Sequence, residues 1–276
     1  MTDLIGANAG ALRAAGLDFI RLTLWLVVVA AVFVPLERWL ALHRQPIGRK
    51  AVLRDVTYYF LNSTLLSLSL AFPLGVVAWV LGEVVPSGVQ SVAADWPPAA
   101  RFAAALVVGE IGGYWGHRLL HEIPFLWRFH ALHHSAEQID FMVNSRAHPL
   151  DLMFTRICGY IPLYALGLLK PFASVTDPAM IAFVVGGTLW AFFIHANIRI
   201  RFGWLEHLFV TPAFHHWHHT RHDHTDHNYA TVLPWIDRLF GTHYLPKNQW
   251  PAEYGTDTKL PDTLAGQLAF PFRRKD

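Results

Sequence analysis

Apolar residues fill five long stretches of this chain, and polar residues gather in the connections between them. The stretches are residues 17–42, 57–82, 102–120, 152–169 and 179–198. A helix needs about 20 apolar residues to cross a bilayer, and these stretches approach or exceed that length. The pattern predicts an all-α integral membrane helical bundle with about four to five spans. The last two stretches could instead form a re-entrant hairpin, because Arg156 interrupts the fourth.

Composition supports a membrane setting and excludes two classes of function. Of the 276 residues, 53% are hydrophobic and only 15% are charged, which is too apolar for most soluble domains. The net charge of +2 is small and the basic residues form no stripe, so we expect no nucleic-acid partner. The single cysteine, Cys158, lies in an apolar stretch and supports neither a disulfide framework nor a thiolate metal site.

Basic residues predict the orientation of the chain in the membrane. The connection between the first two stretches carries Arg38, Arg44, Arg49, Lys50 and Arg54. Cytoplasmic loops are enriched in Lys and Arg, so this connection is expected on the cytoplasmic side. Five crossings then bring the polar region after residue 117 to the same side. We therefore expect a multi-pass protein of a bacterial inner membrane.

Histidines are the main chemical feature of the polar regions. The chain has 17 of them, and most fall between residues 117 and 243. Three sets repeat at helical spacing, namely His117 and His121, then His130, His133 and His134, then His215, His218 and His219. On a continuous helix the members of each set would share one face. His195 ends the fifth apolar stretch and is a ninth candidate.

Grouped imidazoles favour a metal site. They repel one another when protonated and lose hydration when buried and neutral, and a cation that accepts their lone pairs removes both costs. Nine imidazoles exceed what one ion of about four to six ligands can use, so their number favours two ions. Zinc, copper, iron and nickel all accept neutral imidazole, and the spacing does not choose among them.

Acidic residues near the histidines are candidates for orienting them. A ligand histidine normally donates its second N–H to a carboxylate or a carbonyl. Glu122 and Asp237 are the catalytic candidates in this supporting role, and Asp223 and Asp226 are further possibilities. Glu110 lies seven residues before His117, on the same helical stripe. It could support the metal site or form an ion pair with Arg101 or another polar group.

The motifs resemble those of a known enzyme superfamily. The three histidine boxes, HPLD after Arg146, HAN at 195–197, and NYA followed by WIDRLFGT resemble the fatty acid hydroxylase and sterol desaturase superfamily. The resemblance covers about residues 100–245. It implies a membrane di-iron oxygenase that uses dioxygen as co-substrate and hydroxylates or desaturates a lipid C–H bond. It also implies that the nine histidines are iron ligands on the cytoplasmic side.

Two features differ from relatives within the superfamily. Some relatives have a second histidine four residues after the one that His195 matches, where this chain has Arg199. A tenth ligand, if there is one, would be His148 or His222. No HPGG haem-binding motif is present, so we expect electrons to come from a separate donor protein.

These patterns divide the chain and leave two alternative functions open. We predict N-terminal membrane helices at 1–97, a fatty acid hydroxylase-like di-iron domain with a cytosolic helical cap at 98–250, and a C-terminal tail at 251–276. One alternative is a histidine-rich membrane protein that binds or transports metal without redox chemistry, and the other is a bis-histidine haem protein, which would show a Soret band. The lipid substrate and the choice between hydroxylation and desaturation stay open.

Overall fold

The computed structural model describes residues 2–46, 51–169 and 178–273, and the regular structure of this part of the chain consists of helices and two isolated bridges. The longer helices are α1 (Thr2–Trp39), α2 (Val52–Ser69), α3 (Ala71–Val84), α5 (Pro98–Glu122), α7 (Pro149–Ala165) and α8 (Pro178–His195). The short helices are α4 (Ser87–Ser91), α6 (Pro124–His130), α9 (Pro212–His218), α10 (Trp235–Phe240) and α11 (Leu264–Ala269). The 3-10 turns are η1 (His133–Ser135), η2 (Phe141–Ser145), η3 (Gly203–His207) and η4 (Phe270–Phe272). The all-α prediction is confirmed.

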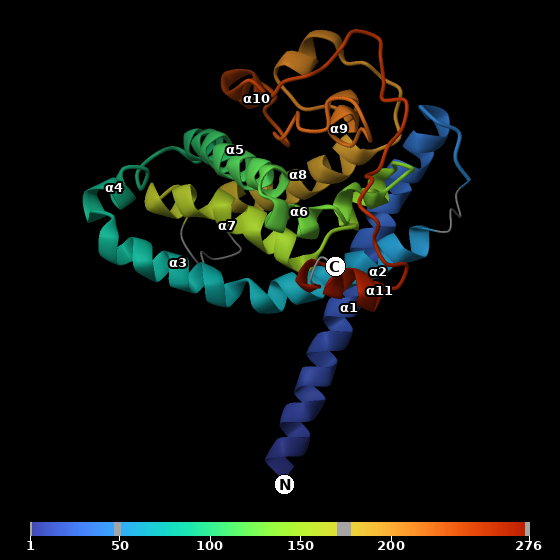
Figure 1. Cartoon of the computed structure of the whole chain (residues 1–276). Helices are drawn as coiled ribbons and strands as arrows, with labels where there is room; N and C mark the ends of the chain where they lie inside the picture. The colour runs from blue at the N-terminus through green and yellow to red at the C-terminus, as the bar shows by residue number, and fades with distance from the viewer. Residues whose placement is uncertain (1, 47–50, 170–177, 274–276) are drawn as a thin grey trace.

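Helix α1 projects from the body of the molecule (Figure 1). Its projecting part exposes large apolar side chains, including Leu17, Phe19 and Leu24, each more than half accessible. Within Arg13–Trp39, an 18-residue window has a mean hydropathy of 2.3, and the segment is long and apolar enough to cross a membrane. Further along, Val29 and Phe33 are buried. The same helix therefore has a membrane-compatible half and a half that packs into the protein.

The second predicted span is broken into two helices. Helices α2 and α3 are bent by 43° relative to each other near Leu70. Pro73 lies in the first turn of α3, and its ring disfavours continuation from the preceding turn. Among the described residues, one helix meets the length and composition of a span, or two if this bent pair crosses as one. The predicted number of four to five spans is not confirmed.

Helices α5 and α7 pack closely in antiparallel directions. Gly112 of α5 faces Gly159 of α7, and a Cβ at Gly116 would lie only 2.8 Å from the Cβ of Cys158. Glycines four residues apart allow two helix backbones to approach one another in this way. The end of α5, with His117, thereby comes beside the start of α7, with Asp151.

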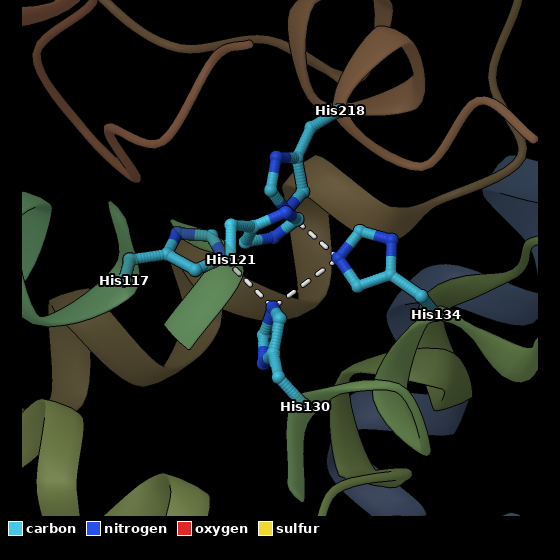
Figure 2. A group of neighbouring side chains, drawn as sticks. All are labelled: His117, His121, His130, His134 and His218. Carbon is cyan, nitrogen blue, oxygen red and sulfur yellow. Dashed lines mark hydrogen bonds between the residues drawn. The ribbon is translucent and has the colours of Figure 1, made fainter. Parts of the chain in front are cut away.

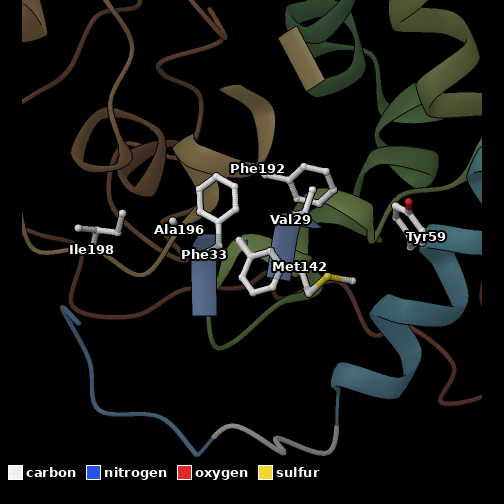
Figure 3. Packing of buried hydrophobic residues seen from close by; sticks show 8 residues of the cluster. Val29, Phe33, Tyr59, Met142, Phe192, Ala196 and Ile198 are labelled. Atoms are coloured by element: carbon white, nitrogen blue, oxygen red, sulfur yellow. The ribbon is translucent and has the colours of Figure 1, made fainter. Parts of the chain in front are cut away.

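A hydrophobic cluster connects α1 to the segments that carry histidines. Phe33 of α1 stacks on Phe141 of η2 at a centroid distance of 5.6 Å, and both contact Phe192 of α8. Figure 3 shows Phe33 and Phe192 side by side in this cluster. An antiparallel bridge between Ala41 and Ile198 continues this contact, because the Arg199 N–H donates to the Leu40 carbonyl at 2.9 Å and the Leu42 N–H to the Asn197 carbonyl at 3.3 Å. The packed half of α1 therefore supports the end of α8.

The C-terminal segment folds back over the body. Tyr58 donates a hydrogen bond of 2.9 Å to Gln267 of α11, and the His148 ring contacts the Leu268 carbonyl at 3.1 Å. Figure 1 shows the end of the chain beside α2 and α7. The predicted division at residues 97 and 250 stays a prediction, and residues 251–273 are packed against the rest of the chain.

Candidate metal centre

All nine histidines predicted as ligands lie in two groups. The five-histidine group consists of His117, His121, His130, His134 and His218. The four-histidine group consists of His133, His195, His215 and His219. Within each group, one ring nitrogen of every member lies within 4.8 Å of those of the others. Figure 2 shows the rings of the five-histidine group converging from several elements on one region.

The two groups are neighbours because each H-x-x-H-H box contributes to both. His133 and His134 are adjacent in sequence but belong to different groups, and so do His218 and His219. Successive side chains on a helical turn point roughly 100° apart, which directs neighbours to different sites. The prediction of a single face is therefore wrong for the two H-x-x-H-H boxes, whereas His117 and His121 of the first box do share a group. The groups also touch, since the rings of His134 and His219 stack at 4.5 Å.

Backbone carbonyls fix the orientation of four rings. The Nδ1 contacts are His117 with Tyr229 (2.7 Å), His133 with Arg146 (3.1 Å), His195 with Ala191 (2.7 Å) and His218 with His227 (2.9 Å). A carbonyl oxygen only accepts hydrogen bonds, so each of these Nδ1 atoms carries the ring hydrogen. In the neutral ring the lone pair is then on Nε2, which faces the group. This is the usual arrangement of a metal-binding histidine.

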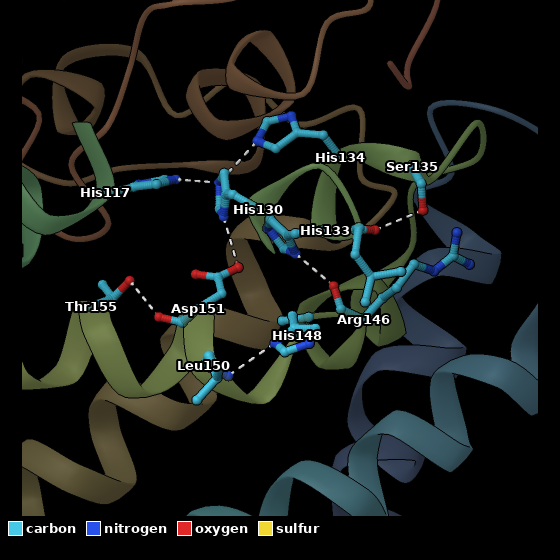
Figure 4. Close-up of polar contacts among 12 residues, drawn as sticks. His117, His130, His133, His134, Ser135, Arg146, His148, Leu150, Asp151 and Thr155 are labelled. Carbon is cyan, nitrogen blue, oxygen red and sulfur yellow. Dashed lines mark hydrogen bonds and ion pairs between the residues drawn. The ribbon is translucent and has the colours of Figure 1, made fainter. Parts of the chain in front are cut away.

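A buried carboxylate orients a fifth ring. The Oδ2 atom of Asp151 lies 2.9 Å from Nδ1 of His130, and both side chains are buried (Figure 4). Asp151 lies in the first turn of α7, where a negative charge is favoured by the helix dipole. Sequence reasoning did not select Asp151, although the HPLD motif that contains it was the available signal.

The Nε2 atoms approach one another closely within each group. The separations are 3.1 Å for His117 and His130, 3.1 Å for His134 and His218, 3.2 Å for His133 and His195, and 2.9 Å for His195 and His215. Where both rings hold their hydrogen on Nδ1, no hydrogen lies between the two Nε2 atoms. Facing lone pairs repel, and a bound cation would turn this repulsion into attraction. The residues present therefore fit a metal ion in each group.

Burial keeps the rings in the form that binds metal. Loss of hydration, reinforced by neighbouring histidines, lowers the pKa well below 6.5 for His133, His134, His215, His218 and His219. These five rings are consequently neutral at pH 7. A neutral imidazole has a lone pair to donate, whereas a protonated one has none.

Several buried polar atoms near the groups have no hydrogen-bond partner in the described part of the chain. They are Nε2 of His121, Nδ1 of His215, Nδ1 of His219 and the hydroxyl of Tyr229. An unpaired buried polar atom costs roughly 1–3 kcal/mol. The Nδ1 atom of His121 lies 3.4 Å from Asp226, so Nε2 is its free ligand atom. A cation in the five-histidine group would satisfy that nitrogen.

Two buried carboxylates hold the loop that supports His117. Asp237 accepts hydrogen bonds from the backbone N–H groups of Tyr229 (2.8 Å) and Ala230 (2.9 Å). Glu110 accepts from the Thr231 hydroxyl at 2.9 Å and from the backbone of the following residues. Asp237 was predicted to contact a ligand ring directly. It instead fixes the Tyr229 peptide, whose carbonyl contacts His117.

A buried ion pair supports the carbonyl that holds His133. Arg146 donates to Asp55 of α2 at 2.6 Å, and both side chains are almost fully buried. Asn62, also on α2, donates to the carbonyls of Ser145 (3.1 Å) and Ala147 (2.9 Å). Helix α2 thereby fixes the backbone on both sides of the Arg146 carbonyl. Sequence reasoning missed this support because its members are far apart along the chain.

The structure corrects the other acidic candidates. Glu122 is about half exposed and pairs with Arg118 at 2.7 Å, with no contact to a ligand histidine among the described residues. Asp223 is exposed to solvent. Asp226 is the one of these predicted acids that lies beside a ligand ring, that of His121.

Neither candidate for a tenth ligand belongs to a histidine group. The His148 ring caps α7 by accepting from the Leu150 N–H, and its Nε2 contacts the Leu268 carbonyl. His222 lies on the surface, 3.4 Å from Glu253. Both rings have other partners, and the proposal of a tenth histidine ligand is not supported by either position.

Comparison with known proteins places this geometry in a family. Residues 102–242, just over half of the chain, match the sequence model of the fatty acid hydroxylase family. The chain belongs to the fatty acid hydroxylase family. The matched range contains all nine histidines of the two groups and both supporting residues Asp151 and Asp237. The superfamily resemblance drawn from the motifs is thereby confirmed.

Curated relatives of this family member are lipid-modifying enzymes by name. It is 38% identical to the ornithine lipid hydroxylase OlsE of Rhizobium tropici over 184 residues, which is 66% of this chain and 53% of that protein. Identity to the human alkylglycerol monooxygenase is 32% over 53% of this chain and 31% of the relative. Identity to the Delta(7)-sterol-C5(6)-desaturase of Nicotiana tabacum is 32% over 53% of this chain and 51% of that protein. The matched segment thus spans about half of these relatives or less, and no solved structure matches.

Proposed function

We propose that this fatty acid hydroxylase family member is a membrane-bound di-iron oxygenase. It would use dioxygen and external electrons to hydroxylate or desaturate a C–H bond of a lipid. The observation that carries the proposal is the pair of histidine groups, in which buried neutral rings direct Nε2 lone pairs at two adjacent points. The names of the relatives, which are a hydroxylase, a monooxygenase and a desaturase of lipids, support the same reaction class.

The two groups would each hold one iron ion. His117, His121, His130, His134 and His218 would bind the first, and His133, His195, His215 and His219 the second. Nine nitrogens shared by two six-coordinate ions leave about three positions for other ligands. When bound, such an iron pair supplies the reduction of dioxygen that oxidation of an unactivated C–H bond requires.

The residues of the chain would orient the ligands and exclude water. Nδ1 contacts with carbonyls and with Asp151 prevent the rings from turning, so that the Nε2 atoms stay directed inward. The side chain of Tyr229 packs against the rings of His117, His121 and His218 and is almost inaccessible to solvent. The buried Tyr229 hydroxyl has no partner in the described chain and could donate a hydrogen bond within the site.

The membrane setting of the proposal follows from α1 and from the basic connection after it. We infer that α1 crosses the bilayer, and that the connection with Arg44 and Arg54 lies on the cytoplasmic side of a bacterial inner membrane. The histidine groups would then face the cytoplasm, where a separate donor protein delivers electrons. Embedding of α2–α3, α5, α7 and α8 would give the four to five spans that the sequence predicts.

A comparison of cellular lipids tests this function. Lipids would be extracted from cells without the protein, with the wild type, with His133→Ala and with His222→Ala. The wild type and the His222→Ala control should produce a lipid that is heavier by one oxygen or lighter by two hydrogens. His133→Ala should produce neither. The same lipid change with His133→Ala would mean that the four-histidine group does not carry the activity.

The alternative of a metal-binding or transport protein has a distinct outcome. Imidazole groups of this kind also accept zinc, so the metal must be identified under iron-replete expression. Zinc alone, together with no oxygen consumption in the presence of an electron donor, would favour the non-redox alternative. Iron together with donor-dependent oxygen consumption would favour the oxygenase.

A further inference from the structure

A pocket outside the histidine groups lies between α6 and the C-terminal segment. Its volume is about 460 Å³, within the range of small-molecule sites. Trp127 and Arg128 of α6 form one side, and Lys259, Phe270 and Arg273 of the C-terminal segment form the other. The pocket therefore exists only because the C-terminal segment folds back over α6.

Three cationic side chains line this pocket without a carboxylate to neutralise them. Arg128 donates to the backbone carbonyls of Phe270 and Arg273, and its guanidinium lies 5.7 Å from the centre of the Phe270 ring. Neither Arg128, Lys259 nor Arg273 forms an ion pair with an acidic residue of the described chain. Like charges gathered around a concave surface repel one another, and an anion bound among them removes that repulsion.

Trp127 joins the pocket to the five-histidine group. Its ring lines the pocket and also contacts the rings of His121 at 5.1 Å and His134 at 5.4 Å. The indole N–H donates to the Thr258 hydroxyl at 3.2 Å, which fixes the ring between the two sites. A molecule held in the pocket is therefore separated from the histidines by one aromatic side chain.

We propose that this pocket binds the anionic headgroup of the lipid substrate. The proposal rests on the lipid oxygenase function and adds a substrate class to it, that of amphiphiles whose headgroup has a net negative charge on a phosphate or carboxylate. The cations would hold the anionic group, while Trp127 and Phe270 contact the adjoining apolar atoms. Basic pockets at the cytoplasmic side of membrane proteins commonly bind acidic lipid headgroups. A concave pocket of about 460 Å³ fits a headgroup better than the surface of a partner protein.

Binding of short-chain lipids tests the proposal without reference to activity. The full-length protein in a neutral detergent would be titrated calorimetrically with dihexanoyl phosphatidylglycerol, dihexanoyl phosphatidylcholine and inorganic phosphate. Lys259→Glu reverses one charge of the pocket at an exposed position and should leave the fold intact. Lys247→Glu makes the same change at an exposed position that does not line the pocket, and is the matched control.

The wild type and Lys247→Glu should bind dihexanoyl phosphatidylglycerol about tenfold more tightly than dihexanoyl phosphatidylcholine, which has the same chains but no net charge. Lys259→Glu should reduce that preference to less than about threefold. If the wild type and Lys259→Glu prefer phosphatidylglycerol equally, the proposal is overturned. The proposal is also overturned if Lys259→Glu and Lys247→Glu lose this preference to the same extent. If inorganic phosphate binds as tightly as dihexanoyl phosphatidylglycerol, the pocket is a site for a soluble anion instead.

Other results separate this inference from the proposed function. If Lys259→Glu leaves lipid binding unchanged but weakens the complex with an acidic electron-donor protein, the pocket is a docking site and the headgroup proposal is wrong. If the comparison of cellular lipids shows no oxidised product, while phosphatidylglycerol binds to the pocket as expected, the oxygenase function is wrong and the bound lipid is not a substrate. If product forms while the binding preference is absent, only the headgroup inference fails.

Discussion

The Nε2 atoms of His133 and His195 lie 3.2 Å apart, although the Nδ1 atom of each ring contacts a backbone carbonyl. Each ring therefore holds its hydrogen on Nδ1, and the lone pairs of the two Nε2 atoms face each other. A buried site with this arrangement is stable when a cation lies between the rings. The relationship supports a metal site at the four-histidine group more directly than the sequence spacing does, and it leads to the predictions that follow.

Replacement of Asp151 should weaken metal binding without removing a ligand. Asp151→Asn keeps the size of the side chain but loses the charge that orients His130. Loss of such a supporting carboxylate typically lowers metal affinity by about 10- to 100-fold. Competition with a chelator would measure this affinity, with the exposed Asp223→Asn as control. Equal affinities of Asp151→Asn and the wild type would contradict the role of Asp151.

The buried pair of Asp55 and Arg146 should be important for stability. Asp55→Leu leaves the buried guanidinium of Arg146 without its carboxylate, which typically costs about 3–5 kcal/mol. Asp257→Leu removes one partner of the more exposed pair with Arg221 and should change stability little. Unfolding in detergent would compare them, and the double variant Asp55→Leu with Arg146→Met should recover much of the loss. Similar effects of the two single variants would show that the buried pair is dispensable.

The stability contributed by Asp237 should depend on pH. Burial raises the pKa of this carboxyl from 3.8 to about 6, so between these values the folded protein binds a proton that the unfolded chain does not. The free energy of unfolding of the metal-free wild type, relative to Asp237→Asn, should therefore rise as the pH falls from 7 through 6 and level off near 4. Each unit of pKa difference corresponds to about 1.4 kcal/mol. A difference that is constant with pH, or that falls on acidification, would contradict the burial of an ionisable Asp237.

Removal of the Tyr229 hydroxyl should not weaken the metal-free protein. Tyr229→Phe deletes a buried hydroxyl that has no partner in the described chain and keeps the aromatic ring beside His121. We expect the unfolding free energy to stay the same or rise by up to about 1 kcal/mol. Bound iron should be retained while product formation falls, because the site loses a hydrogen-bond donor. A marked loss of stability would show that the hydroxyl has a structural partner.

Eight of the nine histidines could be predicted from the sequence because helical spacing is a local property, and His195 because it ends an apolar stretch. Their division into two groups could not, since it depends on where the helices end. Helix α6 ends at His130, and His133 lies in a separate 3-10 turn, so the second box does not lie on one continuous helix. Glu122 was predicted to support a ring because it follows His121 directly, but its side chain turns to Arg118 at the surface.

The supporting residues and the membrane spans show a second limit of sequence reasoning. Asp151 approaches His130 only because α5 and α7 pack closely through small residues such as Gly116. Hydropathy cannot separate an apolar helix that faces lipid from one that faces other helices. Leu163 of α7 is buried within the protein, whereas Leu24 of α1 is exposed. The fold class followed from the pattern of apolar residues, and the number of spans did not.

The metal content of the purified full-length protein tests the central claim most directly. Elemental analysis after iron-replete expression should give about two iron ions per chain, and the absorption spectrum should show no Soret band. His134→Ala, from the five-histidine group, and His219→Ala, from the four-histidine group, should each lower the iron content, whereas His222→Ala should not. One iron or none per chain in the wild type, or iron unaffected by both ligand variants, would contradict a di-iron centre at these groups.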